Sequence, residues 1–229
     1  MIRNIINFTR GKYNELVGKV IEKPYIIKNK TSQQFIFNGA KYDYCYHDYG
    51  TSWRNERTVE IPLAQKALSK YLSAQQSVLE VGNVLQHYSI PRKYTIVDKY
   101  EKAPGVINED IIDFSPSEKF DYIFSISTLE HPGFDEKEKD PRKPLRVLKS
   151  LIKNLEKGGE LFATVPIGYN PAGVESMMLK DPLIQNTQFM KRINGANEWQ
   201  QVGGAEALQC NYNRPFNNAN AIAVINYKN

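Results

Sequence analysis

The sequence contains few of the residues from which disulfide frameworks and metal sites are built. Its 229 residues include two cysteines and three histidines. Cys45 and Cys210 form neither a CxxC pair nor any other metal-binding spacing, so we predict no metal site and no disulfide framework. A reducing compartment is the default for such a chain, and we expect it to be cytoplasmic.

Long apolar runs are missing as well. No stretch of the sequence is apolar for long enough to cross a bilayer. Residues 1–15 contain no sustained apolar region of the kind that a signal peptide has. We therefore expect neither a membrane span nor a signal peptide. The sequence also shows no internal repeat and no low-complexity tract.

No strong excess of one charge sign is present. The formal net charge is +5, from 30 Lys and Arg against 25 Asp and Glu. The longest charge run, residues 135–143, mixes both signs and is typical of an exposed loop. A solvated, Lys-rich surface explains this balance better than a nucleic-acid stripe, so we expect no nucleic-acid partner.

The first third of the chain is rich in aromatic residues. Residues 33–47 contain aromatic runs on both sides of Asn38-Gly39, which is a strong signal for a β-hairpin. Apolar residues then recur at helical spacing from Leu63 to Leu72, and Pro62 fits the first turn of such a helix. We expect residues 1–58 to form an N-terminal extension and possible substrate lid, and residues 59–229 to form the main domain.

From residue 77 onward, short apolar runs alternate with polar segments. A helix with one apolar face is predicted over 145–155, ended by Gly158-Gly159. Strands this apolar are covered on both faces, as in parallel sheets. The pattern predicts an α/β fold with a doubly wound, mostly parallel sheet and an N-terminal hairpin and helix extension. The predicted strands cover 77–81, 94–98, 105–108, 122–127, 160–166, 187–193 and 220–227.

Polar side chains gather at the ends of the predicted strands. Sheets of this kind bind ligands beyond the carboxyl ends of their strands, where the strand order reverses. The first strand ends at Glu80, Val81 and Gly82, and the second at Asp98. Asp110 follows the third strand, and residues 125–133 follow the fourth. This series indicates a nucleotide-type ligand.

The same segments resemble class I S-adenosylmethionine-dependent methyltransferases, from Val78 to Pro166. The resemblance rests on "VLEVGN", "IVDKYE", "NEDIIDF", "FDYIFSISTLEH" and "LEKGGELFATVP" in this order. Two shorter segments, "NERTVEIP" and "PIGYNP", are similar to methyltransferases encoded beside glycosyltransferases in surface-glycan gene clusters. The resemblance implies adenosylmethionine as cofactor and methyl transfer to a small-molecule or glycan acceptor, at a sugar hydroxyl.

The resemblance also implies a role for individual cofactor-site residues. Asp98 would accept hydrogen bonds from the ribose hydroxyls, since one carboxylate can accept from two neighbouring hydroxyls. Asp98 lies 16 positions after Gly82, close to the usual distance of about 20 between a glycine loop and its acidic residue. The other implied positions are Glu80, Gly82 and Asn83 near the methionine end, Asp110 and Ile111 at the adenine, and Ser125 to Ser127 along the methionine moiety.

The loop after the first predicted strand departs from the family pattern. Asn83 and Val84 follow Gly82 where further glycines are usual. Asn tolerates positive φ better than most residues, so Asn83 is expected to make the bend. Pro91 falls shortly before Tyr94, so the helix after the strand must be very short. Such a loop suits adenosylmethionine, which has no phosphate to place at a helix N-terminus.

On the acceptor side, a sugar hydroxyl is a poor nucleophile near neutral pH and needs a general base. His131 is the first candidate base and Glu130 the second, because both follow the fourth strand. One Glu-His pair supplies too few ligands to predict a metal. Residues 53–57 form either a lid over the site or an ion-paired turn. The predicted substrate-binding residues are Tyr49, Trp53, Arg54 and Tyr169.

Two other functions remain compatible with the sequence. A nicotinamide-dependent oxidoreductase uses a similar sheet, but the chain has no G-x-G-x-x-G motif. A non-catalytic binding or scaffold domain would keep the fold without the cofactor, and the glycine-poor loop after Gly82 favours it.

Overall fold

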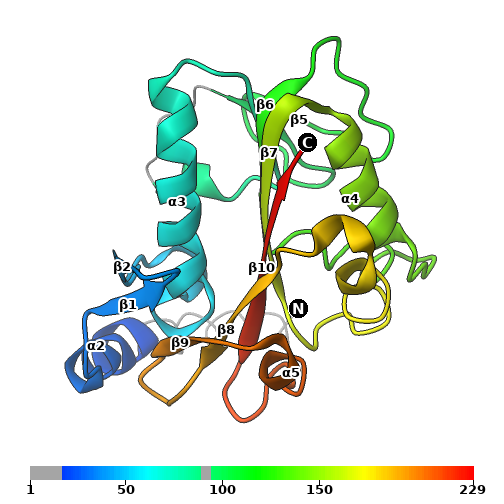
Figure 1. The fold of residues 1–229 in the computed structure, drawn as a ribbon. Coiled ribbons are helices and arrows are strands. Elements are labelled where there is room, and N and C mark those ends of the chain that lie inside the picture. The colour runs from blue at the N-terminus through cyan, green and yellow to red at the C-terminus, as the bar shows by residue number, and fades with distance from the viewer. Residues whose placement is uncertain (1–16, 89–93) are drawn as a thin grey trace, which may run out of the picture.

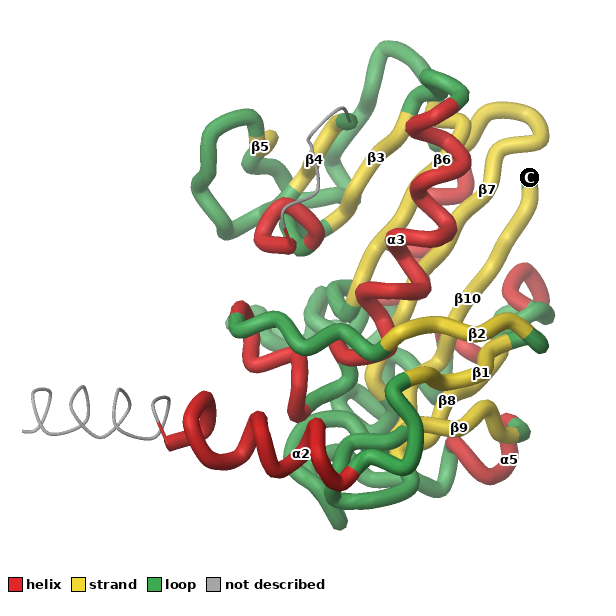
Figure 2. Tube along the Cα trace, turned by 90° about the vertical axis from the view of Figure 1, so that its left-hand side faces the viewer, coloured by secondary structure: helices red, strands yellow, loops and turns green. Residues whose placement is uncertain are grey.

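The computed structural model describes residues 17–88 and 94–229, and its centre is an eight-stranded sheet. The strands run side by side across the molecule (Figure 2). In sheet order they are β5 (Val106–Ile107), β4 (Thr95–Val97), β3 (Val78–Val81), β6 (Phe120–Ile126), β7 (Leu155–Pro166), β10 (Ala221–Lys228), β8 (Gln188–Arg192) and β9 (Trp199–Val202).

The first five strands of this order are parallel to one another. Strand β10 is antiparallel to both of its neighbours, β7 and β8, and β9 is antiparallel to β8. The strand order reverses at β3, which pairs with β4 on one side and β6 on the other. The predicted doubly wound, mostly parallel sheet is confirmed. All seven predicted strands are present, and β9 is an additional edge strand.

Two long helices cover opposite faces of this sheet, α3 (Arg57–Ser73) and α4 (Lys143–Lys153) (Figure 1). Buried residues of α4, such as Leu148 and Leu151, pack in one hydrophobic cluster with Ile123 of β6. On the other face, Leu68 of α3 packs in a second cluster with Phe124. Neighbouring residues of β6 thus point into opposite clusters, which is why most of its residues are apolar, with Asp121 and Ser125 as the exceptions.

Helix α3 begins at Arg57, so Pro62 lies inside the helix and not in its first turn as predicted. Proline has no N–H, and the carbonyl four residues earlier loses its helical partner. In this structure the Thr58 carbonyl instead accepts a hydrogen bond from the Cys45 N–H, at 2.9 Å. The Thr58 hydroxyl also donates to the Cys45 carbonyl, at 3.0 Å. The segment after the hairpin therefore satisfies the group that Pro62 leaves free.

The predicted end of the second helix is wrong by several residues. Helix α4 ends at Lys153, and Asn154 caps it with its N–H on carbonyls of the last turn. Strand β7 starts at Leu155, so Gly158 and Gly159 lie within its first half. The Gly158 N–H donates to the carbonyl of Asn229, at 3.0 Å. These glycines mark the place where the last residue of the sequence pairs with β7.

The predicted hairpin is confirmed, with β1 (Gln34–Phe37) and β2 (Ala40–Asp43) joined by a turn in which Asn38 and Gly39 have positive φ. Phe35 and Phe37 are buried in the same cluster as α3. The expected boundary after residue 58 lies inside α3. The remaining helices are Gly18–Glu22, α2 (Lys23–Asn29), Tyr49–Arg54, Leu85–Tyr88, Met178–Lys180, Pro182–Ile184 and α5 (Gly204–Ala207).

Of the helices in residues 17–88 and 94–229, none has the length and apolar character that crossing a bilayer requires. The expectation about a signal peptide concerns residues 1–15, which lie outside the described residues.

Candidate active site

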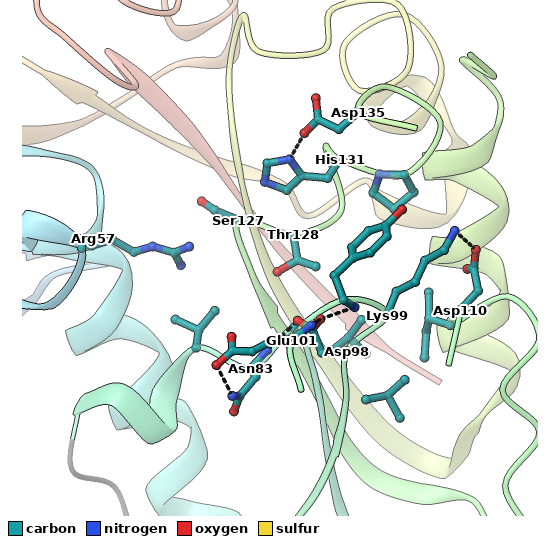
Figure 3. A pocket seen from close by; sticks show the side chains of 18 of the residues that line it. Arg57, Asn83, Asp98, Lys99, Glu101, Asp110, Ser127, Thr128, His131 and Asp135 are labelled. Carbon is teal, nitrogen blue, oxygen red and sulfur yellow. Dashed lines mark hydrogen bonds and ion pairs between the residues drawn. The ribbon is translucent and has the colours of Figure 1, made fainter. Parts of the chain in front are cut away.

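A cavity of about 730 Å³ opens beyond the carboxyl ends of β3, β4 and β6. This is the point where the strand order reverses, and ligands of doubly wound sheets bind there. Figure 3 shows side chains from the loops after these strands, and from the start of α3, surrounding the cavity. Of the predicted site residues, those that line it are Tyr49, Gly82, Asn83, Asp98, Asp110, Ile111, Ser127 and His131.

Gly82 makes the bend after β3, with φ of 87°. Asn83 was predicted to make this bend and does not, because its φ is not positive. A Cβ at position 82 would overlap the Thr128 hydroxyl oxygen and lie 3.0 Å from Thr128 Cγ2. Both the backbone angle and the close approach of Thr128 therefore require glycine here.

Glu80 does not line the cavity but is fully buried beneath the loop. Its Oε1 accepts hydrogen bonds from the N–H groups of Val84 at 2.9 Å and Leu85 at 2.8 Å. Burial raises the pKa of Glu80 to about 7, although these N–H groups favour the charged form. The loop lacks additional glycines and is held in place by this carboxyl group. One short turn, Leu85–Tyr88, follows; Pro91 lies outside the described residues.

This burial predicts a pH dependence of stability. Between pH 4.5 and about 7 the folded protein retains the Glu80 proton while the unfolded chain releases it. The free energy of unfolding should therefore fall as pH rises through this window, by up to about 3 kcal/mol, and level off above it. Glu80→Gln keeps an acceptor oxygen for the loop and removes this titration. Urea unfolding at pH 5 and pH 8 should show a larger loss in the wild type than in the variant; equal losses would contradict the assignment.

At the end of β4, Asp98 and Glu101 both face the cavity. Asp98 accepts hydrogen bonds from three backbone N–H groups, those of Asn83 at 3.2 Å, Tyr100 at 2.8 Å and Glu101 at 2.7 Å. Glu101 accepts from the side-chain amide of Asn83 at 2.8 Å, and its carboxylate lies 2.9 Å from His87 Nε2. The structure thus presents two neighbouring carboxylates where the sequence predicted one.

Asp110 is held by two lysines. Its Oδ2 accepts from Lys99 at 2.9 Å and from Lys143 at 2.7 Å, and its Oδ1 accepts from the Ile112 N–H at 3.2 Å. Partial burial raises the pKa of Asp110, but the hydrogen bonds from Lys143 and Lys99 outweigh it and lower the pKa to about 2. Asp110 is therefore an ionised, already bonded group, and a ligand amine would have to share it. Ile111 lies beside it on the cavity wall.

The loop after β6 lies against Gly82 and supplies another part of the cavity wall. Ser127 lines the cavity with φ of 39°, and its hydroxyl donates to Glu60 at 2.6 Å. Thr128 also lines the cavity. Ser125 does not: it is fully buried and its hydroxyl donates to the carbonyl of Val81, at 3.0 Å. Ser125 therefore ties β6 to β3 beneath the site.

Arg57 reaches the cavity from the first turn of α3 (Figure 3). Its guanidinium donates to the carbonyl of Ile126 at 3.0 Å and lies 3.6 Å from the carboxylate of Glu60. Burial lowers the pKa of Arg57, while Glu60 and Glu56 raise it by more. Burial also raises the pKa of Glu56, as does its neighbour Glu60. Arg57 is thus a permanent cation beside two buried glutamates.

His131 lines the cavity, and its neighbour Glu130 is buried beside it. His131 Nδ1 is hydrogen-bonded to the carboxylate of Asp135, and its Nε2 lies 3.4 Å from Glu130 Oε1. Burial raises the pKa of Glu130 well above its ordinary value. The two candidate bases predicted from the sequence therefore lie next to each other. Asp135 is a third acidic or basic group in this cluster, through its hydrogen bond to His131.

The predicted substrate residues are placed differently from one another. Tyr49 lines the cavity, is 44% exposed, and stacks on His87 with ring centres 4.0 Å apart. Trp53 is fully buried, so its ring has no face available to a ligand. Arg54 does not line the cavity and pairs with Glu22 at 3.2 Å. Tyr169 does not line the cavity: its ring meets the ring of His131 edge-on, and its hydroxyl donates to Asp135 at 2.8 Å.

Several cavity residues were not among the predicted cofactor or catalytic residues. Arg57 was grouped only with the possible lid, and no sequence signal relates it to the end of β6. Glu101 follows Asp98 by three positions, a spacing that a turn can bring together. Asp135 follows His131 by four positions, within a charged run that was interpreted as an exposed loop. Within the described parts of the chain, no group of three or more His, Cys, Asp or Glu side chains is arranged to hold a metal ion.

Among known proteins, the similarity that was found for this chain is to solved structures. The chain matches no protein-family model and no curated protein. A methyltransferase from Archaeoglobus fulgidus that depends on S-adenosylmethionine is 14% identical, with 79% of this chain and 98% of that chain covered and a TM-score of 0.47. The N-methyltransferase NodS from Bradyrhizobium japonicum WM9, in complex with S-adenosylhomocysteine, is 14% identical, with 76% and 91% covered and a TM-score of 0.43. An rRNA methylase from Streptococcus thermophilus is also 14% identical, with 74% and 96% covered and a TM-score of 0.45.

The fold of this chain follows from its own sheet order. The sheet has five parallel strands, its order reverses at β3, and β10 is antiparallel to its neighbours. Helices cover both of its faces. Its cavity lies at the reversal. The chain therefore has a class I methyltransferase-like α/β fold.

Proposed function

We propose that the chain is a methyltransferase that binds S-adenosylmethionine in the cavity at the end of β3. The observation that carries this proposal is the charge of the cavity. Seven carboxylate residues line it, against two permanent cations, Arg57 and Lys99. The seven are Glu56, Asp98, Glu101, Glu109, Asp110, Asp135 and Glu136. The whole chain carries a formal net charge of +5, so this acidic lining is a local feature of the site.

An acidic cavity favours a cationic ligand over a phosphate-bearing one. Adenosylmethionine carries a sulfonium and an ammonium group against a single carboxylate. A dinucleotide needs cations or a helix N-terminus for its pyrophosphate. Lys99 is already bonded to Asp110 and Glu136, and Arg57 lies 3.6 Å from Glu60. Between the end of β3 and residue 88, where the first described range ends, the only helical element is the short turn Leu85–Tyr88. The nicotinamide-dependent alternative is therefore disfavoured.

The residues present fit this cofactor. Asp98 and Glu101 would accept from the ribose hydroxyls, and Ile111 would contact the adenine ring. Gly82, Ser127 and Thr128 would lie along the methionine moiety, where a Cβ on residue 82 would fill the space next to Thr128. When bound, the cofactor supplies an electrophilic methyl group on its sulfonium.

We propose a neutral hydroxyl as acceptor, on a sugar of a glycan or of a small molecule. His131 borders the cavity and would take the hydroxyl proton. Tyr49 offers an exposed aromatic ring at the cavity, a surface on which a sugar ring can stack. In this proposal the segment from α2 to Arg57 covers the acceptor side. Its residues in the cavity wall are Tyr49, Gly50, Asn55, Glu56 and Arg57.

The proposal predicts that the wild-type protein binds S-adenosylmethionine and S-adenosylhomocysteine with micromolar affinity, about −8 kcal/mol. Titration calorimetry with both compounds and with NAD⁺ tests it. NAD⁺ should give no binding heat, because the cavity offers its pyrophosphate no partner. No heat and no thermal shift with millimolar adenosylmethionine would reject the proposal and favour a non-catalytic domain with this fold.

Variants of the two carboxylates at the end of β4 sharpen this test. Asp98→Ala should weaken cofactor binding by about 2–4 kcal/mol if its carboxylate holds the ribose. Glu101→Ala is the matched variant, since Glu101 is half-exposed and accepts from Asn83 rather than from three backbone groups. A loss confined to Glu101→Ala would move the ribose contact to Glu101.

A further inference from the structure

We infer that Asp135 is a positioning residue that holds the imidazole of His131 as its Nδ1–H tautomer, so that Nε2 carries no hydrogen and can accept the proton of the acceptor. The catalytic use of Nε2 rests on the proposed function. The tautomer itself rests only on the contacts around His131.

Asp135 and His131 are brought together by a tight turn. The N–H groups of Phe134 and Asp135 both donate to the carbonyl of His131, at 2.9 and 3.0 Å. This turn places the Asp135 carboxylate against His131 Nδ1 (Figure 3). Partial burial raises the pKa of Asp135, but the hydrogen bonds from His131 and Tyr169 outweigh it and keep the pKa below its ordinary value. An ionised carboxylate only accepts, so Nδ1 must carry the proton.

Tyr169 fixes Asp135 in turn. Its hydroxyl donates to the same carboxylate oxygen that bonds His131, at 2.8 Å. Its ring meets the His131 ring edge-on, with centres 5.1 Å apart, and is itself packed edge-on against Phe134 and Tyr212. The imidazole is thus held by a hydrogen bond on one edge and by an aromatic ring on one side.

The other ring nitrogen, Nε2, faces Glu130, a carboxyl group whose pKa is shifted in the opposite direction from that of Asp135. Glu130 is 2% exposed, and its Oε1 lies 3.4 Å from His131 Nε2. Burial raises the pKa of Glu130, and the nearby Glu60 raises it further. Two carboxyl groups therefore flank one imidazole: Asp135, whose pKa lies below its ordinary value, and Glu130, whose pKa lies well above it. Environments that separate two carboxyl pKa values in this way assign different roles to the two groups.

The surrounding charges act on both carboxyl groups. Lys139 lowers the pKa of Asp135 from its own loop. Arg57 lowers the pKa of Glu130 from α3, but burial together with Glu60 and Glu56 outweighs it and keeps the pKa of Glu130 raised. In a transfer to a hydroxyl, the acceptor oxygen would form a bond to the methyl carbon, the carbon–sulfur bond of the sulfonium would break with its electron pair going to sulfur, and the hydroxyl proton would pass to Nε2. The imidazolium then donates from both nitrogens, and the carboxylate of Asp135 stabilises its charge.

The test is ¹⁵N spectroscopy of the full-length protein labelled at histidine. The chain has three histidines, so a His131→Gln spectrum assigns the signals. The other two are internal references of the opposite tautomer. His47 Nδ1 accepts from the Tyr49 N–H at 3.1 Å, and His87 Nε2 bonds Glu101 at 2.9 Å. Neutral His131 should show a protonated Nδ1 and an unprotonated Nε2, while His47 and His87 show the reverse.

Asp135→Ala should abolish this signature at His131 and leave the signals of His47 and His87 in place. Glu138→Ala is the matched control, because Glu138 is an exposed carboxylate of the same loop and His131 bonds Asp135 instead. A wild-type His131 protonated at Nε2, or in a mixture of both tautomers, overturns the inference. So does an Asp135→Ala spectrum in which His131 is unchanged.

The same samples separate this inference from the proposed function. Binding of S-adenosylhomocysteine, followed by calorimetry on the wild type, tests the cofactor site. Cofactor binding without the Nδ1–H signature overturns only the role of Asp135. The Nδ1–H signature without cofactor binding overturns the methyltransferase and confirms the positioning of His131 by Asp135.

Discussion

The Gly82→Ala variant is expected to lose cofactor binding and about 2–4 kcal/mol of its free energy of unfolding, the sum of backbone strain and overpacking. The backbone at Gly82 has φ of 87°, which a residue with a side chain adopts only with strain. The added Cβ would also overlap the Thr128 hydroxyl and approach Thr128 Cγ2 to 3.0 Å. Either the loop after β3 or the loop after β6 must move, and both line the cavity.

A second substitution separates the two causes. Thr128→Ala removes the hydroxyl and the methyl group that the new Cβ would meet, and leaves only the Thr128 Cβ, at 3.2 Å. If the steric overlap dominates, Gly82→Ala in the Thr128→Ala background should recover part of the stability. If the backbone angle dominates, the double variant should be no more stable than Gly82→Ala. Urea unfolding and calorimetry with S-adenosylhomocysteine measure both effects. Wild-type stability and affinity in Gly82→Ala would refute the structural role of this glycine.

The strands of the sheet were predictable because of where they lie. Strand β6 is covered by α3 on one face and by α4 on the other, so most of its residues are apolar. The hairpin was predictable for a local reason, since Asn38-Gly39 supplies the positive φ values of its turn. Strand β9 was not predictable, because it is a short edge strand in which only Trp199 is buried.

The site was predictable in position but not in side-chain direction. Side chains within a strand point to the faces of the sheet, whereas residues that follow a strand can point across its end. Glu80 lies in β3 and Ser125 in β6, and both are buried away from the cavity. Gly82 and Ser127 follow these strands and line it. The family pattern in the sequence does not distinguish residues that line the cavity from residues that are buried beneath it.

Contacts between distant segments account for the remaining differences. Arg57 lies 69 positions before the Ile126 carbonyl to which it donates. That contact exists because α3 starts five residues before Pro62, which was predicted to lie in the first turn, and packs across the end of β6. Trp53 looked available for stacking in the sequence, but the fold buries it completely. No local spacing encodes either result.

The second large effect is expected at His131. If this residue is the general base of the proposed methyl transfer, His131→Ala should lower turnover by about 10²–10⁴. Cofactor affinity should be nearly unchanged, because His131 takes its proton from the acceptor. Turnover is measured as transfer of a radiolabelled methyl group from S-adenosylmethionine to a panel of neutral saccharides.

Three controls give this prediction its meaning. Glu130→Gln keeps the size and hydrogen-bonding capacity of the second candidate base, and it should retain most activity if His131, and not Glu130, is the base. His47→Ala removes a histidine that does not line the cavity and should be active. Wild-type turnover should survive EDTA, since a base needs no metal.

Three outcomes would contradict this prediction. Activity lost in Glu130→Gln but kept in His131→Ala would transfer the role of the base to Glu130. A wild-type protein that loses turnover with the chelator would indicate a metal in place of a general base. A fully active His131→Ala with an accepted saccharide would leave His131 as a structural partner of Asp135.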